Sequence, residues 1–149
     1  MLKSTIEKQL LEAMKNKDDV QKVALRTTLS SIKLAEIENG KPLDDAAVIT
    51  IIQKEIKIRK ESISDAQKSG RDDLSAQAAS EILVLEKLLP KQLSEDELRA
   101  LIVQVIQEQN ATSIPDTGKV MKVVIPLVMG RAPNDLISKL VKEYLAGQQ

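Results

Sequence analysis

The sequence predicts an all-α protein, and both its composition and the spacing of its apolar residues support this class. Tyr144 is the one aromatic residue among 149, and Phe, Trp, Cys and His are absent. A core must therefore consist of aliphatic side chains, which suits packed helices better than a β-sandwich. Gly and Pro number five each, too few for a chain with many tight turns. Apolar residues recur at helical spacing along most of the sequence.

Four amphipathic helices are expected in the first 89 residues, over 4–16, 19–39, 45–69 and 72–89. Asp18 and Asp44 stand where an N-cap is needed, since their side chains can accept from the first free amides of the helices that follow. Asn39-Gly40 and Ser69-Gly70 provide the stops, because glycine readily adopts the left-handed conformation that ends a helix. This half of the chain therefore predicts a helical bundle.

The helix expected over 45–69 carries two apolar stripes. Ile52 and Ile56 belong to the first stripe, whereas Ile51 and Ile58 form a second one, more than about 100° away around the helix. Arg59 lies at the edge of the first stripe, so its stem should be packed and its guanidinium paired. Arg26 is expected to be similar. We predict a buried ion pair between Arg26 or Arg59 and Glu55.

A short joint separates two helical units. Pro90 disfavours helical geometry in the residue before it, and Ser94 with Glu97 forms a capping box that starts a new helix. Leu93 and Leu98 are placed to form a hydrophobic staple. The predicted organisation is an N-terminal helical bundle over 1–89, a proline-containing linker, and a C-terminal three-helix domain over 94–149.

Three shorter helices are expected after the joint, over 95–109, 114–129 and 134–146. Ser113 is a candidate N-cap for the second of them, and Pro115 suits its first turn. Apolar residues surround this second helix almost completely, so we expect it to be central and buried. Tyr144 lies within the apolar stripe of the last helix and is expected to belong to the core.

Several function classes are unsupported by the composition. Lys and Arg together number 22, as do Asp and Glu, so the chain lacks a global basic field for nucleic acid. Without Cys or His, the usual thiol nucleophile, general base and metal ligands are missing. Neither a catalytic constellation nor a cofactor or metal motif is found. With no signal peptide or membrane-length apolar run, a cytoplasmic location is expected.

A local basic patch is expected in the C-terminal unit, where five bases face three acids from residue 111 onward. Two lysines share a strip of one helix, two share a flank of the last helix, and two glycines would permit a close approach of a phosphate backbone. A bend at the second glycine could bring both lysine pairs beside an arginine. The candidate nucleic-acid-binding residues are Gly118, Lys119, Lys122, Gly130, Arg131, Lys139 and Lys142.

An ordered set of short motifs covers nearly the whole chain. They are Leu25-Arg26, the run from Lys54 to Ser62, Gly70-Arg71-Asp72-Asp73-Leu74, Glu81-Ile82-Leu83, Leu89 to Ser94, Gly118-Lys119-Val120-Met121 and Gly130-Arg131-Ala132. In this order they resemble the GatB/YqeY family. The resemblance implies a free-standing protein similar to the helical tail of the GatB component of the glutamine-dependent tRNA amidotransferase, a tail that helps to hold tRNA.

This resemblance implies that Gly118, Lys119, Met121, Gly130 and Arg131 lie in or beside a surface facing RNA. Pro133-Asn134 departs from the Asp-Gly usual in the family, so the loop there should differ in shape. We therefore expect a non-catalytic tRNA-binding accessory protein. Two alternatives remain: a protein-interaction adaptor that uses the Ile51/Ile58 stripe or the groove between the units, and a protein that associates in trans with the subunits of an amidotransferase.

Overall fold

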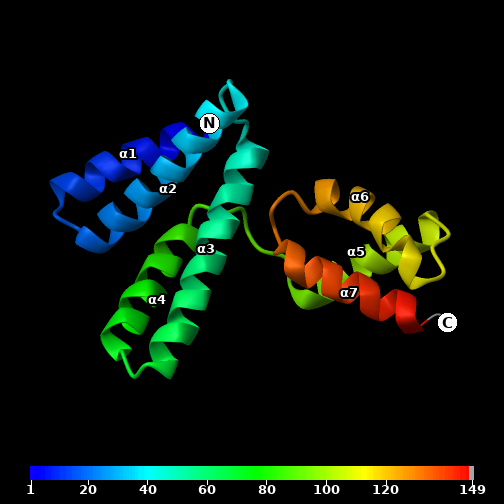
Figure 1. The fold of residues 1–149 in the computed structure, drawn as a ribbon. Coiled ribbons are helices and arrows are strands. Elements are labelled where there is room, and N and C mark those ends of the chain that lie inside the picture. Colours follow the sequence, from blue (N-terminus) through cyan, green and yellow to red (C-terminus); the bar gives the residue numbers. More distant parts are fainter. Residues whose placement is uncertain (148–149) are drawn as a thin grey trace. The chain divides into compact units, whose positions relative to one another are not determined.

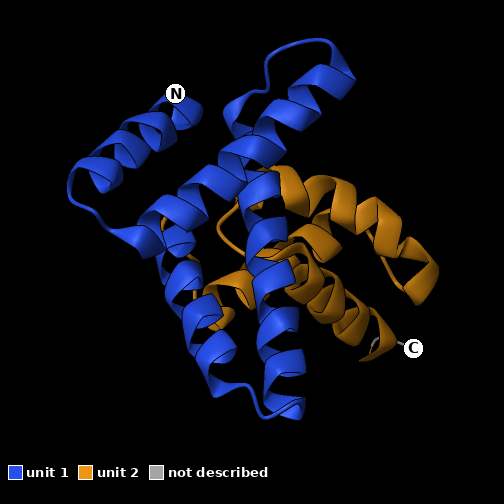
Figure 2. Cartoon of the chain, turned by 60° about the vertical axis from the view of Figure 1, so that its left-hand side comes forward, with its two compact units in different colours: residues 1–89 blue, residues 90–149 orange. Residues whose placement is uncertain are grey.

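The structure is a computed structural model that describes residues 1–147, and every element in this range is helical (Figure 1). The chain divides into two compact units, residues 1–89 and residues 90–149 (Figure 2). Each unit encloses its own aliphatic core. The predicted all-α class is confirmed.

Unit 1 consists of two antiparallel helical hairpins (Figure 1). Their helices are α1 (Leu2–Lys15), α2 (Asp19–Asn39), α3 (Asp45–Lys68) and α4 (Asp72–Glu86). The most extensive contact joins α3 to α4, and α2 packs against the other three helices. Leu25, Ile32, Ile52 and Leu85 are wholly buried between the two hairpins, so α2 is the central helix of this unit.

Predicted capping residues set three helix ends of unit 1. The Asp18 carboxylate accepts from the Gln21 amide at 3.1 Å, and Asp44 accepts from the Ala47 amide at 2.8 Å. Gly40 ends α2 with a φ of 71°, in the left-handed region that other residues enter at a cost. Local sequence therefore determines where α2 and α3 begin and where α2 ends.

The helix α4 ends at Glu86, three residues before the predicted end at Leu89. The amides of Leu88 and Leu89 donate to the carbonyls of Leu85 and Glu86, three residues back, at 3.0 and 3.2 Å. The last turn is thus tighter than an α-helix. Pro90 accounts for this exit, because its ring disfavours the α conformation at Leu89.

Unit 2 contains α5 (Glu95–Glu108), the 3₁₀ turn η1 (Ile114–Asp116), α6 (Thr117–Val128) and α7 (Asn134–Gly147). The predicted capping box is present: the Glu97 amide donates to Ser94 Oγ at 3.1 Å, and the Ser94 amide donates to Glu97 Oε2 at 3.3 Å. Leu98, at the predicted staple position, is wholly buried, and Leu93 packs against the same core.

Residues 90–93 are tied to the loop between α6 and α7. The Leu93 amide donates to the Arg131 carbonyl at 2.8 Å. Gln92 Nε2 donates to the Gly130 carbonyl at 3.3 Å. The segment that leads into α5 is therefore held by hydrogen bonds within unit 2.

The prediction of one buried helix over 114–129 is wrong in two respects. A 3₁₀ turn precedes the α-helix, which covers Thr117–Val128. Val120, Val124 and Val128 are buried, but Ile125 and Leu127 are 39% and 48% exposed. A bundle of three short helices leaves each helix one side toward solvent, so an apolar circumference does not produce complete burial here.

Replacing the Ser94 cap should destabilise unit 2. Ser94→Ala removes the acceptor for the Glu97 amide, and we expect the free energy of unfolding to fall by about 1 kcal/mol. Urea denaturation followed by circular dichroism measures this change. Ser64→Ala, on the exposed surface of α3, is the control and should leave stability unchanged or slightly higher. Equal effects of the two substitutions would contradict the capping role.

Candidate functional site

The two lysines of α6 lie together on its solvent side. Lys119 and Lys122 are exposed, whereas Val120 and Val124 face the core. Lys119 and Lys122 are the only charged residues of α6, and no acidic residue lies between Thr117 and Val128. The outer surface of α6 is therefore positively charged, as the spacing predicted.

The start of α6 is open to solvent beside these lysines. A β-carbon at Gly118 would meet no atom within 4 Å, so packing within the protein does not require glycine there. Asp116 stands just before the helix, where its carboxylate accepts from the amides of Thr112 and Ser113 at 3.0 and 3.3 Å. These hydrogen bonds, with a smaller contribution from Lys119, hold the pKa of Asp116 below its usual value.

The two lysines of α7 are also exposed, opposite the buried Ile137 and Val141. Acidic residues accompany Lys139 and Lys142 on this helix. Glu143 is one of them, and its carboxylate lies 3.8 Å from the Arg99 guanidinium of α5. The charge of α7 is therefore mixed, unlike that of α6.

The structure does not gather all the predicted basic residues into one cluster. Because α6 and α7 run antiparallel (Figure 1), Gly118 lies at one end of α6 and Gly130 beyond the other. The helical segment from Gly118 to Val128 alone is about 15 Å long. The bend at Gly130 thus does not bring Lys119 beside Arg131.

Arg131 has a structural role that the sequence did not reveal. Its Nε donates to the Val128 carbonyl at 3.1 Å, and its terminal nitrogen donates to the Leu127 carbonyl at 3.4 Å. The guanidinium thereby satisfies carbonyls that the end of α6 leaves without an intrahelical partner. Met121, implied to lie near RNA, is half-buried and packs against the core of unit 2.

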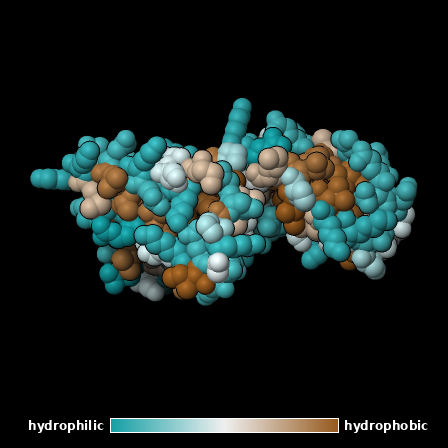
Figure 3. Space-filling view, turned by 90° about the horizontal axis from the view of Figure 1, so that it is seen from above, coloured by the Kyte–Doolittle hydropathy of each residue, from teal (hydrophilic) through white to brown (hydrophobic). Residues whose placement is uncertain are grey.

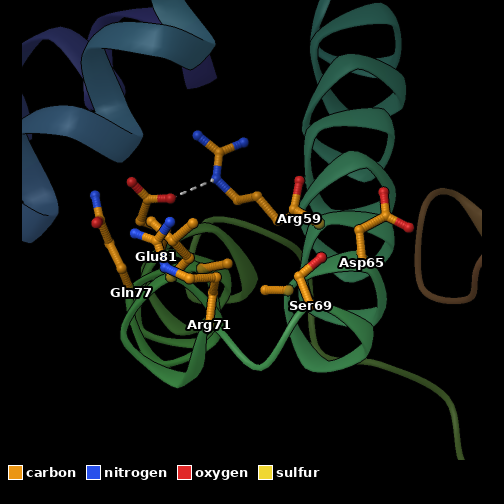
Figure 4. Close-up of a pocket in the computed structure, with 10 residues that line it drawn as sticks. Arg59, Asp65, Ser69, Arg71, Gln77 and Glu81 are labelled. Atoms are coloured by element: carbon orange, nitrogen blue, oxygen red, sulfur yellow. Dashed lines mark hydrogen bonds and ion pairs between the residues drawn. The ribbon is translucent and has the colours of Figure 1, made fainter.

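A second polar site lies between α3 and α4, where a cleft of about 570 Å³ opens. Figure 4 shows Arg59 of α3 and Glu81 of α4 pointing toward each other across it, with Arg71 on the same side as Glu81. Arg71 is itself paired with Asp73, at 3.3 Å. The lining residues are Arg59, Ser62, Asp65, Ala66, Ser69, Arg71, Leu74, Gln77, Ala78 and Glu81.

Arg59 is buried and paired, as predicted. Its terminal nitrogen lies 2.9 Å from Glu55 Oε2, and its Nε lies 3.3 Å from Glu81 Oε2. All three side chains are at least nine-tenths buried. Ser31 Oγ on α2 donates to the other Glu55 oxygen at 2.7 Å. We call these four residues the Arg59 network; it joins α2, α3 and α4.

One expectation about unit 1 needs correction. Arg26 is exposed, so it takes no part in the buried pair. In the second stripe of α3, Ile51 packs against the core of unit 1, whereas Ile58 is 43% exposed, so the stripe is divided between the core and the surface. Glu81 was missed, although its place among the buried Ala78, Ile82 and Leu85 of α4 signals a charged side chain that needs a partner.

The chemistry of the cleft is limited by the Arg59 network. Two carboxylates engage the Arg59 guanidinium, so it offers little free charge to an anionic ligand. Within residues 1–147 no group of three or more acidic side chains is placed to hold a metal ion. None of the helices in this range combines the length and apolar character needed to span a membrane.

A model of the family described as Yqey-like protein matches residues 3–145, nearly the whole chain. The chain belongs to the YqeY-like family. The match confirms the resemblance inferred from the ordered motifs, and it includes the residues of the Arg59 network and of the α6 surface.

Curated relatives include mitochondrial proteins of yeasts. The "Altered inheritance of mitochondria protein 41, mitochondrial" of Kluyveromyces lactis is 35% identical over 109 residues, which cover 70% of this chain and 58% of that protein. Its namesake in Lachancea thermotolerans is 36% identical over 108 residues, with the same shares. An uncharacterized protein of Schizosaccharomyces pombe is 32% identical over 93 residues, 62% of this chain and 76% of that protein.

These comparisons correct the predicted location. The YqeY-like chain spans a little over half the length of the first two relatives, and both are named as mitochondrial proteins. The cytoplasmic location inferred from the lack of a signal peptide is therefore contradicted. Amino-acid composition could not predict the compartment, because targeting signals determine location and the chemistry of a folded domain does not.

Removing the charge of Arg59 should destabilise unit 1 strongly. Arg59→Met keeps much of the side-chain volume but leaves Glu55 and Glu81 buried without their cation, so we expect a loss of about 3–5 kcal/mol. Chemical denaturation measures the loss. Arg26→Met is the matched control and should change stability by less than about 0.5 kcal/mol. Similar small effects of both substitutions would contradict the importance of the network.

Proposed function

We propose that the YqeY-like protein is a non-catalytic accessory protein that binds tRNA through unit 2. The observation that carries this proposal is the surface of α6, where Lys119 and Lys122 are exposed and no acidic side chain belongs to the helix. Lysine ammonium groups at such spacing suit the phosphates of a nucleic acid backbone. The resemblance to the tRNA amidotransferase tail supports tRNA as the RNA.

The mode of binding follows from the side chains available. Tyr144, the single aromatic residue of the sequence, is partly buried and packs against the core of unit 2, so one face of its ring is engaged within the protein and it makes a poor platform for stacking on bases. Contacts with phosphates and with the shape of a folded RNA are compatible with this surface. Binding should then weaken steeply as salt rises, because counterions are released from the RNA when lysines neutralise its phosphates.

Gly118 and Arg131 contribute differently to this proposal. The open space around Gly118 allows a phosphate backbone to approach the start of α6 beside Lys119. Arg131 caps the far end of the same helix through its guanidinium, so it maintains the surface rather than extending it. Lys139 and Lys142 are a secondary contact, since acidic residues share their helix.

Reversing both α6 charges tests the proposal. In a tRNA titration, Lys119→Glu/Lys122→Glu should weaken binding roughly ten-fold or more and reduce the slope of log affinity against log salt by about 2. Fluorescence anisotropy with labelled tRNA at several salt concentrations measures both quantities on the full chain.

The matched control is Lys8→Glu/Lys41→Glu, which changes the net charge equally on exposed positions of unit 1. It should reduce affinity far less than the α6 variant. Absence of saturable tRNA binding at low salt, or equal losses in the two variants, would overturn the proposal.

A further inference from the structure

The helix α2 presents a stripe of exposed residues along its whole length, opposite the core. Spacings of three and four residues alternate along it without a break. Its members, hereafter the outer stripe of α2, are Val20, Val23, Thr27, Ser30, Leu34 and Ile37. Val20 and Val23 are 38% and 40% exposed, and Leu34 and Ile37 are 57% and 77% exposed. Figure 3 shows for one face of the molecule that hydrophobic residues lie among hydrophilic ones; the members of the outer stripe are identified by their exposed fractions.

The fold of unit 1 does not require these apolar side chains. The buried residues of α2, including Leu25, Leu29 and Ile32, lie on the opposite side of the helix. The hydroxyl of Thr27 donates a hydrogen bond to the Val23 carbonyl of the same helix, at 2.8 Å. The methyl group of Thr27 can therefore contribute to the apolar surface of the outer stripe.

The spacing itself indicates what would cover the stripe. Alternating steps of three and four residues form a seven-residue repeat, the pattern by which one α-helix packs against another in a coiled coil. The stripe spans 18 residues, or about 26 Å of helix from Val20 to Ile37. A partner helix of similar length therefore fits it better than a globular surface or an extended peptide does.

The charges beside the stripe indicate both the partner and its direction. Arg26 and Lys33 lie on one flank of the stripe. Ser31 and Glu38 lie on the other flank, each five residues after its counterpart. In a parallel pair of helices these positions face each other across the seam. Two identical helices would thus form two Lys33–Glu38 pairs. An antiparallel pair would instead bring the basic flanks, with Arg26 and Lys33, together.

We propose that the outer stripe of α2 pairs in parallel with the α2 helix of a second copy of this chain. Equivalent residues meet across a two-fold axis, so Val20, Val23, Leu34 and Ile37 each contact their counterparts. One helix pair of this length buries less than a standard interface of roughly 1,600 Å². The dimer should therefore dissociate on dilution.

Sedimentation velocity over a range of concentrations tests the association. The full chain should shift from monomer to dimer as its concentration rises, and Leu34→Glu should leave it monomeric at all concentrations. The control is Leu83→Glu on α4, which is also exposed, at 61%, and lies outside the stripe; it should dimerise as the unmodified chain does. A chain that stays monomeric, or a Leu34→Glu variant that still dimerises, would overturn the proposal.

Charge reversal tests the proposed pairs. Lys33→Glu and Glu38→Lys should each weaken dimerisation roughly ten-fold at low salt, since each turns two attractive pairs into two repulsive ones. The double variant Lys33→Glu/Glu38→Lys should restore it. A double variant as weak as the single variants would refute the parallel register.

Cysteine cross-linking gives the direction independently, because the chain has no cysteine of its own. In the parallel pair, Leu34→Cys places two thiols opposite each other, and mild oxidation should yield a disulfide-linked dimer. In an antiparallel pair centred on the stripe these thiols would be about 16 Å apart along the axis, too far for a disulfide. Leu83→Cys is the control and should remain monomeric; equal cross-linking of both variants would count against the proposal.

Discussion

The buried charge of Arg59 constrains the whole of unit 1. A guanidinium taken out of water loses several kcal/mol of solvation, which carboxylates recover only in good geometry. Glu55 supplies one carboxylate from the preceding turn of α3, and Glu81 supplies the other from α4. Ser31 then holds Glu55 from α2. Three helices must therefore take up one mutual arrangement before this charge is satisfied.

The distance between partners in sequence decides which of these contacts could be foreseen. Glu55 and Arg59 are four residues apart, so helical geometry alone places them side by side. Glu81 and Ser31 lie 22 and 24 residues from their partners, and only the packing of the hairpins brings them in. The N-caps at Asp18, Asp44 and Ser94 could be predicted for the same reason. Each capping side chain accepts a hydrogen bond from the amide three residues later, so local helix geometry alone brings the two groups together.

The α6 surface shows the same limit on what the sequence can predict, here for a candidate binding site. Helical spacing was sufficient to place Lys119 and Lys122 together, since both belong to one helix. The position of Arg131 could not be inferred, because its partners are the carbonyls of Leu127 and Val128. Those become available only where Met129 and Gly130 adopt positive φ values and end the helix. The exposure of Ile125 likewise depends on how many helices surround α6.

Buried and exposed sides of α2 depend on each other. The outer stripe can serve as an interface only if its helix is held straight and in a fixed rotation, since ordering a mobile element on association reduces affinity. The core residues Leu25 and Ile32, together with the Ser31 contact to Glu55, provide this restraint on the opposite side. The network that satisfies Arg59 thus also preorganises the surface through which we expect two copies to meet.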